Sequence, residues 1–312
     1  MTRSKNMKTN ILTARFGGPF HWGKDLTSVL NSRGIAARHF HTVPRLVTSA
    51  LYQDADIIHT TIPFPFKLWQ KPLVLTMHGE YTIEHNIWQR FYPKTIAQTN
   101  VITVPSHYLK QRLELQNAIV IPNALFTERF KSAQHGDREQ LNLVSVTVFH
   151  FANKVAGIPK IIEVLDKIQN CRFTYTVVGG GRHLETVKKQ ASGTSLDIRF
   201  TDFLPDPRPS LAASDIFLYY SYHDNFPNVI LEAMASGLPV ITNNVGAVTE
   251  IIDHGKNGYI AESDEAYLEH LLNLVNNSSL RQNIGLKARQ TMEEKFDWSK
   301  VISSYIDIYK TL

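Results

Sequence analysis

The chain has 312 residues, 43% hydrophobic and 20% charged, a composition typical of a globular protein large enough for two domains. It has no run of about eighteen apolar residues and no apolar core in residues 1–10, so neither a membrane-spanning helix nor a secretory signal is expected. The single cysteine, Cys171, excludes an internal disulfide and a cysteine-rich zinc site. Together these features predict a cytoplasmic protein.

The charge is unevenly distributed. Residues 1–135 contain 16 Lys and Arg against 7 Asp and Glu, a net charge of +9, whereas residues 136–312 contain 17 against 21, a net charge of −4. A basic half could meet a phosphorylated acceptor or an anionic membrane, which would place the protein at the inner face of that membrane. Solvated charge without a partner is the alternative. The charges are dispersed and no nucleic-acid-binding motif is present, so nucleic acid is not expected as a partner.

Short apolar strands alternate with amphipathic helices along the chain, which predicts α/β domains with parallel sheets covered by helices. In the first half we expect strands at residues 11–14, 36–40, 57–60, 73–77, 101–104 and 119–121, and helices at residues 24–31 and 106–114. The polar, aperiodic stretch 131–140 is the expected linker.

A second alternation begins near residue 143. Its expected strands are residues 143–149, 173–178, 198–201, 216–219 and 240–242, and its expected helices are residues 158–168, 183–190, 228–236 and 267–275. From residue 280 the chain is predicted to be helical, with a break near residues 296–297. We therefore expect domains at residues 1–135 and 136–296, and a terminal helix at residues 297–312 that could cross back to the first domain.

The most informative segment is residues 223–240, which predicts a loop that runs into a helix. Pro227 and Asn228 are suitable entry residues, apolar residues then recur at helical spacing, and a Gly-Leu-Pro sequence ends the helix. Glu232 would lie about one turn inside, near a helix end whose free N–H groups and partial positive charge suit a phosphate. With Asp224 in the loop, the segment could hold a ligand that carries both hydroxyl and phosphate groups.

This segment resembles the E-x7-E motif of retaining GT-B glycosyltransferases of family 4, also called glycosyl transferases group 1. The usual form is E-G-F-P-N-x-x-L-E-A-M-A-x-G-x-P-V. Here Asp224 replaces the first Glu and Asn225 the following Gly, and the rest, from Phe226 to Val240, fits well. The resemblance covers most of the chain and is specific from Thr174 to about Gly258.

The resemblance implies a GT-B fold, in which two Rossmann-like domains with parallel sheets face a central cleft. Ligands in such sheets bind beyond the carboxyl ends of the strands. The N-terminal domain would then lie on the acceptor side, and the C-terminal domain would bind the nucleotide sugar.

The activity implied by the resemblance is that of a retaining hexosyltransferase. It would move a sugar from a UDP- or GDP-linked nucleotide-diphosphate sugar to a hydroxyl of a sugar, lipid-linked or glycan acceptor. The product would be a cell-envelope polysaccharide, a lipopolysaccharide or a glycolipid. Apart from the nucleotide sugar as co-substrate, neither a cofactor nor a metal is expected.

By the same resemblance, Glu232 would hold the ribose hydroxyls and Asp224 the hydroxyls of the transferred sugar, so both are expected catalytic residues. The loop and first helical turn between them would position the donor. The donor-binding candidates in this stretch are Asn225, Phe226, Pro227, Asn228 and Val229.

The phosphate-binding residues depart from the family pattern. Members usually carry an Arg and a Lys after the first strand of the donor domain. Aligning the chain on Gly157 places Phe151 at the Arg position and Ala156 at the Lys position. Lys154 is the nearby cation and is predicted to contact phosphate.

Two further segments resemble nucleotide-contacting regions of the family. Val177-Val-Gly-Gly-Gly-Arg-His183 resembles its V-G-x-G segment, which makes Gly180 and Arg182 candidates for nucleotide contact. Residues 200–204 resemble a strand end that touches the nucleobase through backbone groups, which adds Phe203.

On the acceptor side, His78 follows an apolar strand and resembles the histidine of the family's T-x-H segment, which lies near the transferred sugar. Its expected role is hydrogen bonding and charge stabilisation, and a structural histidine is the alternative. Gly17 and Gly18 resemble a Gly-rich loop that faces the reaction centre, although an ordinary strand-to-helix turn would also need them.

Two other functions remain open at this stage. The lost Arg and the changed Glu are compatible with a nucleotide-sugar-binding subunit of low activity, and a GT-B sugar-nucleotide epimerase would share the fold. A nicotinamide oxidoreductase is disfavoured, because Leu184 stands where a G-x-G-x-x-G fingerprint needs its third glycine.

Overall fold

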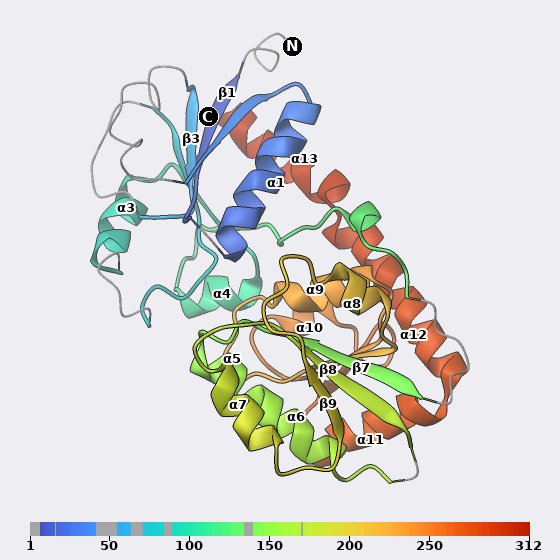
Figure 1. Cartoon of the computed structure of the whole chain (residues 1–312). Coiled ribbons are helices and arrows are strands. Elements are labelled where there is room, and N and C mark those ends of the chain that lie inside the picture. Colours follow the sequence, from blue (N-terminus) through green and yellow to red (C-terminus); the bar gives the residue numbers. More distant parts are fainter. Residues whose placement is uncertain are drawn as a thin grey trace. The chain divides into compact units, whose positions relative to one another are not determined.

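The computed structural model describes residues 7–15, 17–41, 55–63, 71–83, 89–133, 140–169 and 171–312. The chain splits into two compact units, one comprising Met1–Leu125 with Phe296–Leu312 and the other Phe126–Lys295 (Figure 1). The first boundary therefore lies earlier than the expected position at residue 135. Residues 134–139 of the expected linker lie outside the described residues.

Backbone hydrogen bonds explain where the first unit ends. The Leu125 N–H donates to the Phe296 carbonyl at 2.9 Å, so the two passages of the chain between the units are paired. Soon after, the Ala133 N–H donates to the Ser236 carbonyl at 2.7 Å, which fixes this stretch on the second unit. The polar stretch 131–140 thus begins inside the second unit rather than before it.

The first unit contains a six-stranded parallel sheet in the order β2-β1-β3-β4-β5-β6. Its strands are β1 (Lys8–Leu12), β2 (Ala36–Phe40), β3 (Ile57–Thr60), β4 (Leu73–Thr76), β5 (Val101–Val104) and β6 (Ile119–Val120). Its helices are α1 (Gly18–Ser32), α3 (Tyr92–Gln98), α4 (His107–Arg112) and α13 (Trp298–Thr311), with a 3-10 turn at Gln89–Phe91. All four residues of β3 are buried, as expected for an inner strand of a parallel sheet.

The C-terminal helix α13 packs against α1 within the first unit (Figure 1). A buried polar chain ties it to the sheet: His59 Nδ1 lies 2.5 Å from the Tyr309 hydroxyl, and His59 Nε2 lies 2.6 Å from Thr76 Oγ1. Burial, and secondarily the nearby His78, lowers the pKa of His59 to about 3, so its ring is neutral. A neutral imidazole has one donor and one acceptor, and both are used here.

The second unit contains a second six-stranded parallel sheet in the order β12-β11-β10-β7-β8-β9. Its strands are β7 (Leu141–Val146), β8 (Phe173–Val178), β9 (Asp197–Phe200), β10 (Ile216–Tyr219), β11 (Val240–Asn243) and β12 (Tyr259–Ala261). Its helices are α5 (Ala152–Val155), α6 (Gly157–Leu165), α7 (Leu184–Ala191), α8 (Arg208–Ala212), α9 (Asn228–Ala235), α10 (Val248–Ile251), α11 (Asp264–Asn276) and α12 (Ser278–Thr291), with a 3-10 turn at Thr127–Arg129. A π-helical turn at Met292–Phe296 links α12 to α13.

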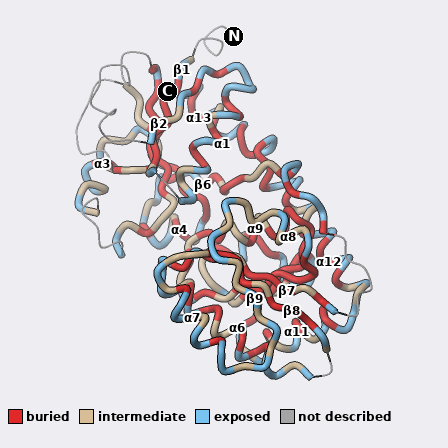
Figure 2. The backbone as a smooth tube through the Cα atoms, in the orientation of Figure 1, coloured by how far each residue is buried: buried red, intermediate tan, exposed pale blue. Residues whose placement is uncertain are grey.

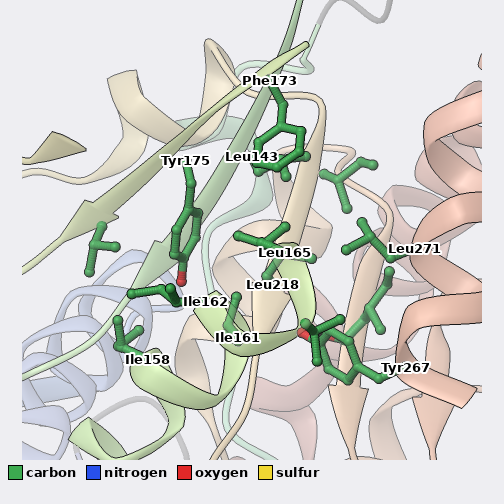
Figure 3. Close-up of a cluster of buried hydrophobic side chains, with 14 of the residues drawn as sticks. Leu143, Ile158, Ile161, Ile162, Leu165, Phe173, Tyr175, Leu218, Tyr267 and Leu271 are labelled. Carbon is green, nitrogen blue, oxygen red and sulfur yellow. The ribbon is translucent and has the colours of Figure 1, made fainter. Parts of the chain in front are cut away.

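The main core of the second unit lies between its sheet and helices α6 and α11 (Figure 3). Two tyrosines carry polar groups into this core, and both groups are satisfied. The Tyr175 hydroxyl lies 2.7 Å from Ser145 Oγ, and the Tyr267 hydroxyl donates to the carbonyls of Tyr219 and Ile241 at 3.2 and 3.3 Å. Figure 2 shows that inner strands such as β7 and β8 are mostly buried, whereas the outer faces of the helices are exposed.

The expected strands at residues 36–40, 57–60, 101–104, 173–178 and 216–219 coincide with β2, β3, β5, β8 and β10. Helix α1 starts at Gly18 rather than at residue 24, because Pro19 is well placed in a first helical turn and Trp22 is buried. In the described part of the chain, no helix combines the length and apolar character needed to cross a bilayer.

The His59–Tyr309 contact predicts how firmly α13 is held. Substitution Tyr309→Phe leaves a buried nitrogen of His59 without its partner, so we expect the free energy of unfolding to fall by about 1–3 kcal/mol in urea denaturation. Ser304→Ala, on the exposed side of α13, is the control and should change stability little. Equal stability of Tyr309→Phe and the wild type would show that this hydrogen bond does not hold the helix.

Candidate functional site

The second sheet gathers the donor-side candidates at its carboxyl edge. Lys154 follows β7, Gly180 and Arg182 follow β8, and Phe203 follows β9. The segment from Asp224 to Glu232 follows β10, which pairs with β7. Because carboxyl ends of neighbouring parallel strands lie at one edge, residues distant in sequence meet here, where open α/β sheets bind ligands.

Asp224 is the most tightly held residue of this edge. It is only 6% exposed, and its Oδ2 accepts a 2.5 Å hydrogen bond from the Tyr219 hydroxyl and lies 2.6 Å from Lys154 Nζ. Its Oδ1 accepts from the Asn225 N–H at 2.8 Å. Both carboxylate oxygens are therefore already engaged by the protein.

The loop after β11 clamps the backbone of this segment. Gly246 has a φ of +58°, and a Cβ there would lie 2.3 Å from the Asp224 carbonyl oxygen and 2.9 Å from that of Asn225. The Ala247 N–H donates to the Asn225 carbonyl at 3.0 Å. Only glycine combines this backbone angle with so close an approach.

Helix α9 begins directly after this loop. Pro227 occupies its N-cap, no side chain caps it, and no acidic residue lies in its first turn. Phe226 is buried beneath the entry, whereas Asn228 and Val229 are half-buried. The partial positive charge of the helix end is therefore not neutralised by the helix's own side chains, which suits an anionic ligand.

Glu232 lies on α9 and is half-buried. Burial raises the pKa of its carboxyl to about 7, with the charge of Asp206 adding to the rise and Arg208 opposing it. Within the described part of the chain, its carboxyl group has no hydrogen-bond or ion-pair partner. Unlike Asp224, it can meet a ligand without breaking an existing contact.

Arg208 and Asp206 are a feature of the site that the sequence interpretation missed. The guanidinium group binds both oxygens of Asp206, at 2.7 and 2.8 Å, and donates to the Arg129 carbonyl at 3.3 Å. The two charges of this pair have opposite effects on Glu232: that of Asp206 raises the pKa of its carboxyl group and that of Arg208 lowers it. The sequence Asp206-Pro-Arg208-Pro at the start of α8 is the available signal, because it fixes opposite charges two residues apart on a stiff backbone.

The remaining donor candidates differ in how they are held. Lys154 keeps 34% of its side chain exposed although its ammonium group is bound to Asp224. Arg182 is exposed and donates to His183 Nε2 at 3.1 Å. Phe203 is 73% exposed and packs so closely over Gly180 that a Cβ there would lie 2.8 Å from the Cβ of Phe203.

The acceptor-side candidates belong to the first unit. Burial lowers the pKa of His78 to about 4, although a hydrogen bond with the side chain of Asn123 acts to raise it, so the imidazole is neutral. Its ring lies 5.0 Å from that of Trp22, and its buried Nε2 has no hydrogen-bond partner among the residues that the structure describes. Gly17 is the N-cap of α1 with a φ of +83°, and Gly18 is the first residue of that helix.

Residues 142–277 match the family model "Glycosyl transferases group 1", and residues 14–129 match the model "Glycosyltransferase Family 4". The chain belongs to this family of glycosyltransferases. The motif-based recognition is therefore confirmed, and the two matches fall on the two units. Within the described residues, no group of three or more His, Cys, Asp or Glu could hold a metal ion.

Among the relatives, N-acetyl-alpha-D-glucosaminyl L-malate synthase of Bacillus anthracis is 30% identical over 233 residues, which cover 69% of this chain and 60% of that protein. Phosphatidyl-myo-inositol mannosyltransferase of Mycobacterium leprae is 22% identical over 280 residues, which cover 83% of this chain and 74% of the relative. Anabaena Alr3699/HepE, solved in complex with UDP and glucose, matches with a TM-score of 0.78 at 17% identity, covering 98% of this chain and 100% of that one. The expected GT-B fold class is confirmed by this likeness and by the two parallel sheets.

The clamp by Gly246 leads to a prediction about stability. Gly246→Ala adds both backbone strain and a clash with the Asp224 carbonyl, whereas Gly255→Ala adds strain alone, because Gly255 has a φ of +77° and nothing within 4 Å of its Cβ position. We expect Gly255→Ala to cost about 1–2 kcal/mol of unfolding free energy and Gly246→Ala clearly more. Urea denaturation of both variants measures the difference. Equal costs would contradict the close approach.

Proposed function

We propose that the chain is a retaining glycosyltransferase that moves a sugar from a nucleotide-diphosphate sugar to an acceptor hydroxyl. The observation that supports this most directly is the loop and helix from Asp224 to Glu232 at the carboxyl edge of the second sheet. It combines an uncapped helix N-terminus, which suits phosphate, with a carboxyl group on Glu232 that has no protein hydrogen-bond partner in the described chain.

In the proposed reaction, the bond between the sugar and the diphosphate breaks through an oxocarbenium-like state, and negative charge grows on the leaving diphosphate. The N–H groups at the start of α9 and the ammonium group of Lys154 would stabilise that charge, with Arg182 as a second cation. Each charge-assisted hydrogen bond of this kind contributes roughly 1.5–3 kcal/mol. Donors that are already fixed in place need little reorganisation during the reaction.

The rest of the donor would extend along the same edge. Glu232 would bind the ribose hydroxyls, and the backbone from Asn225 to Val229 would position the sugar. Phe203, whose backbone and Cβ lie against Gly180, is 73% exposed and could stack on the base. UDP is the first donor nucleotide to test, because the structurally similar HepE was solved with UDP and glucose. GDP is the second.

His78 would serve on the acceptor side. Its neutral ring can donate or accept a hydrogen bond at the transferred sugar but carries no charge at neutral pH. That suits same-face substitution, in which the acceptor hydroxyl attacks from the side of the departing diphosphate and the configuration is retained without a covalent intermediate. This route requires no metal ion.

We further propose a lipid-linked or glycan acceptor, used at the cytoplasmic face of a membrane. The mycobacterial relative is by its name a mannosyltransferase acting on phosphatidyl-myo-inositol, and residues 1–135 carry a net charge of +9. Sedimentation with vesicles containing anionic lipid tests this proposal. Salt should weaken the association if it is electrostatic, and no binding to anionic over neutral vesicles would count against it.

A nucleotide-sugar-binding subunit of low activity is the second candidate. It is favoured by Phe151, which is 62% exposed at the position where the family carries a phosphate-binding Arg. Incubation of the purified chain with UDP-glucose and GDP-mannose, followed by analysis for transfer or hydrolysis, separates the two. Binding without either reaction would favour the subunit.

Removing the carboxyl group of Glu232 should abolish transfer while the fold remains. We expect Glu232→Ala to lose all measurable turnover and to bind UDP at least about tenfold more weakly, since one hydrogen bond to a charged group is worth that much or more. Glu269→Ala, at an exposed acidic residue of α11, is the matched control. Undiminished turnover in Glu232→Ala would remove the basis for the proposed donor site.

The raised pKa of Glu232 predicts a pH dependence of nucleotide binding. An ionised carboxylate accepts hydrogen bonds from two ribose hydroxyls, so affinity for UDP should rise as the pH increases through about 7. Titration calorimetry of the wild type and Glu232→Gln measures this effect. The variant shares any ionisation of the phosphate but lacks that of the carboxyl group, so an identical pH profile in both proteins would refute the assignment.

A further inference from the structure

Lys154 is held by the protein before any ligand arrives. Its Nζ lies 2.6 Å from Asp224 Oδ2, yet 34% of its side chain is exposed, whereas the Asp224 side chain is only 8% exposed. The carboxylate of this ion pair is therefore shielded from solvent, whereas part of the lysine side chain remains accessible to a ligand. An ammonium group has three N–H donors, so one contact to Asp224 leaves donors for an anion at the edge.

The carboxylate of Asp224 is in turn held by a hydrogen bond from Tyr219. This residue ends β10, is 6% exposed, and donates its hydroxyl proton to the same oxygen that binds Lys154, at 2.5 Å. Burial, followed by the charge of Asp224, holds the pKa of Tyr219 well above its usual range, so the hydroxyl stays protonated and acts as a donor. With the Asn225 N–H on the other oxygen, the carboxylate group is held at both oxygens.

A fixed ammonium group matters at this position because the Arg that family members usually carry after this strand is absent. Phe151 occupies the place of that Arg and has no polar group, and Lys154 comes from a four-residue helix, α5. Immobilising a free lysine side chain costs about 1.5–2 kcal/mol in rotamer entropy. A contact that already restricts the lysine removes part of that cost from ligand binding.

We propose that Tyr219 and Asp224 are positioning residues that hold the Lys154 ammonium group at the carboxyl edge of the second sheet, where it binds the diphosphate group of the donor. The inference rests on the proposed function, since it names the cation of that same site. It gives Asp224 a role through Lys154, in place of the direct contact with sugar hydroxyls that the family resemblance implies. It also adds Tyr219, which has no role in the motif.

A double-mutant cycle tests the inference, with UDP and GDP as diphosphate ligands and uridine and guanosine as ligands without phosphate. Tyr219→Phe should lower the affinity for the preferred nucleoside diphosphate about tenfold and leave the affinity for the corresponding nucleoside unchanged. Lys154→Met should lower the affinity for the diphosphate by at least as much, and Lys154→Arg should recover part of that loss. In the Lys154→Met background, Tyr219→Phe should have no further effect, because its action passes through the lysine.

Tyr175→Phe is the matched control, since it removes a buried hydroxyl that contacts Ser145 rather than Asp224. Its affinities should equal those of the wild type. Three outcomes would overturn the inference while the proposed function stands. They are additive losses of affinity in the cycle, equal losses of affinity for diphosphate and nucleoside, and tighter diphosphate binding by Tyr219→Phe. A wild-type chain that binds neither UDP nor GDP would overturn both.

Discussion

The candidate site depends on strand-end loops whose backbones approach more closely than side chains allow. A Cβ at Gly157 would lie 1.7 Å from the Tyr220 carbonyl oxygen, and one at Gly179 would lie 1.8 Å from that of Thr147. Gly246 makes the third such contact, against Asp224. Each of these segments thus contacts the backbone of a segment that follows a neighbouring strand, and the strand order of the sheet determines where the segments lie. Side chains that face a ligand are therefore placed by the rigid core rather than by flexible loops.

The acidic side chains at this edge differ in whether they form an ion pair with a basic side chain. Asp224 and Asp206 are paired with Lys154 and Arg208, whereas Glu232 has no ion-pair partner within the described chain, and burial raises its pKa to about 7. A half-buried carboxyl group without a partner is costly for folding, and such costs concentrate where a ligand supplies the missing contacts. The contrast separates acidic groups that are held by basic side chains from Glu232, whose carboxyl group has no ion pair with any described residue.

Sequence reasoning located most strands and the sheet edge at which the candidate residues lie, but not the contacts among those residues. The strands β3, β8 and β10 were predictable because apolar runs are typical of inner parallel strands. The three-residue strand β12 and the five-residue helix α8 were missed, since elements so short show no periodicity. The Tyr219–Asp224 and Arg208–Asp206 pairs were also missed, because a hydrogen bond depends on side-chain direction and reach, which local spacing does not specify.

Three departures from the family motif become connected once Lys154 and Asp224 are seen in contact. The losses of Arg at Phe151 and of Lys at Ala156 remove two cations, and Lys154 is a cation at a different position of the same stretch. Asp224, one methylene shorter than the usual glutamate, is 6% exposed and contacts both Lys154 and the Tyr219 hydroxyl. Taken one by one, the changes suggest a weakened donor site. Their contacts instead show a different arrangement of charge, which under the proposed function would bind the same diphosphate.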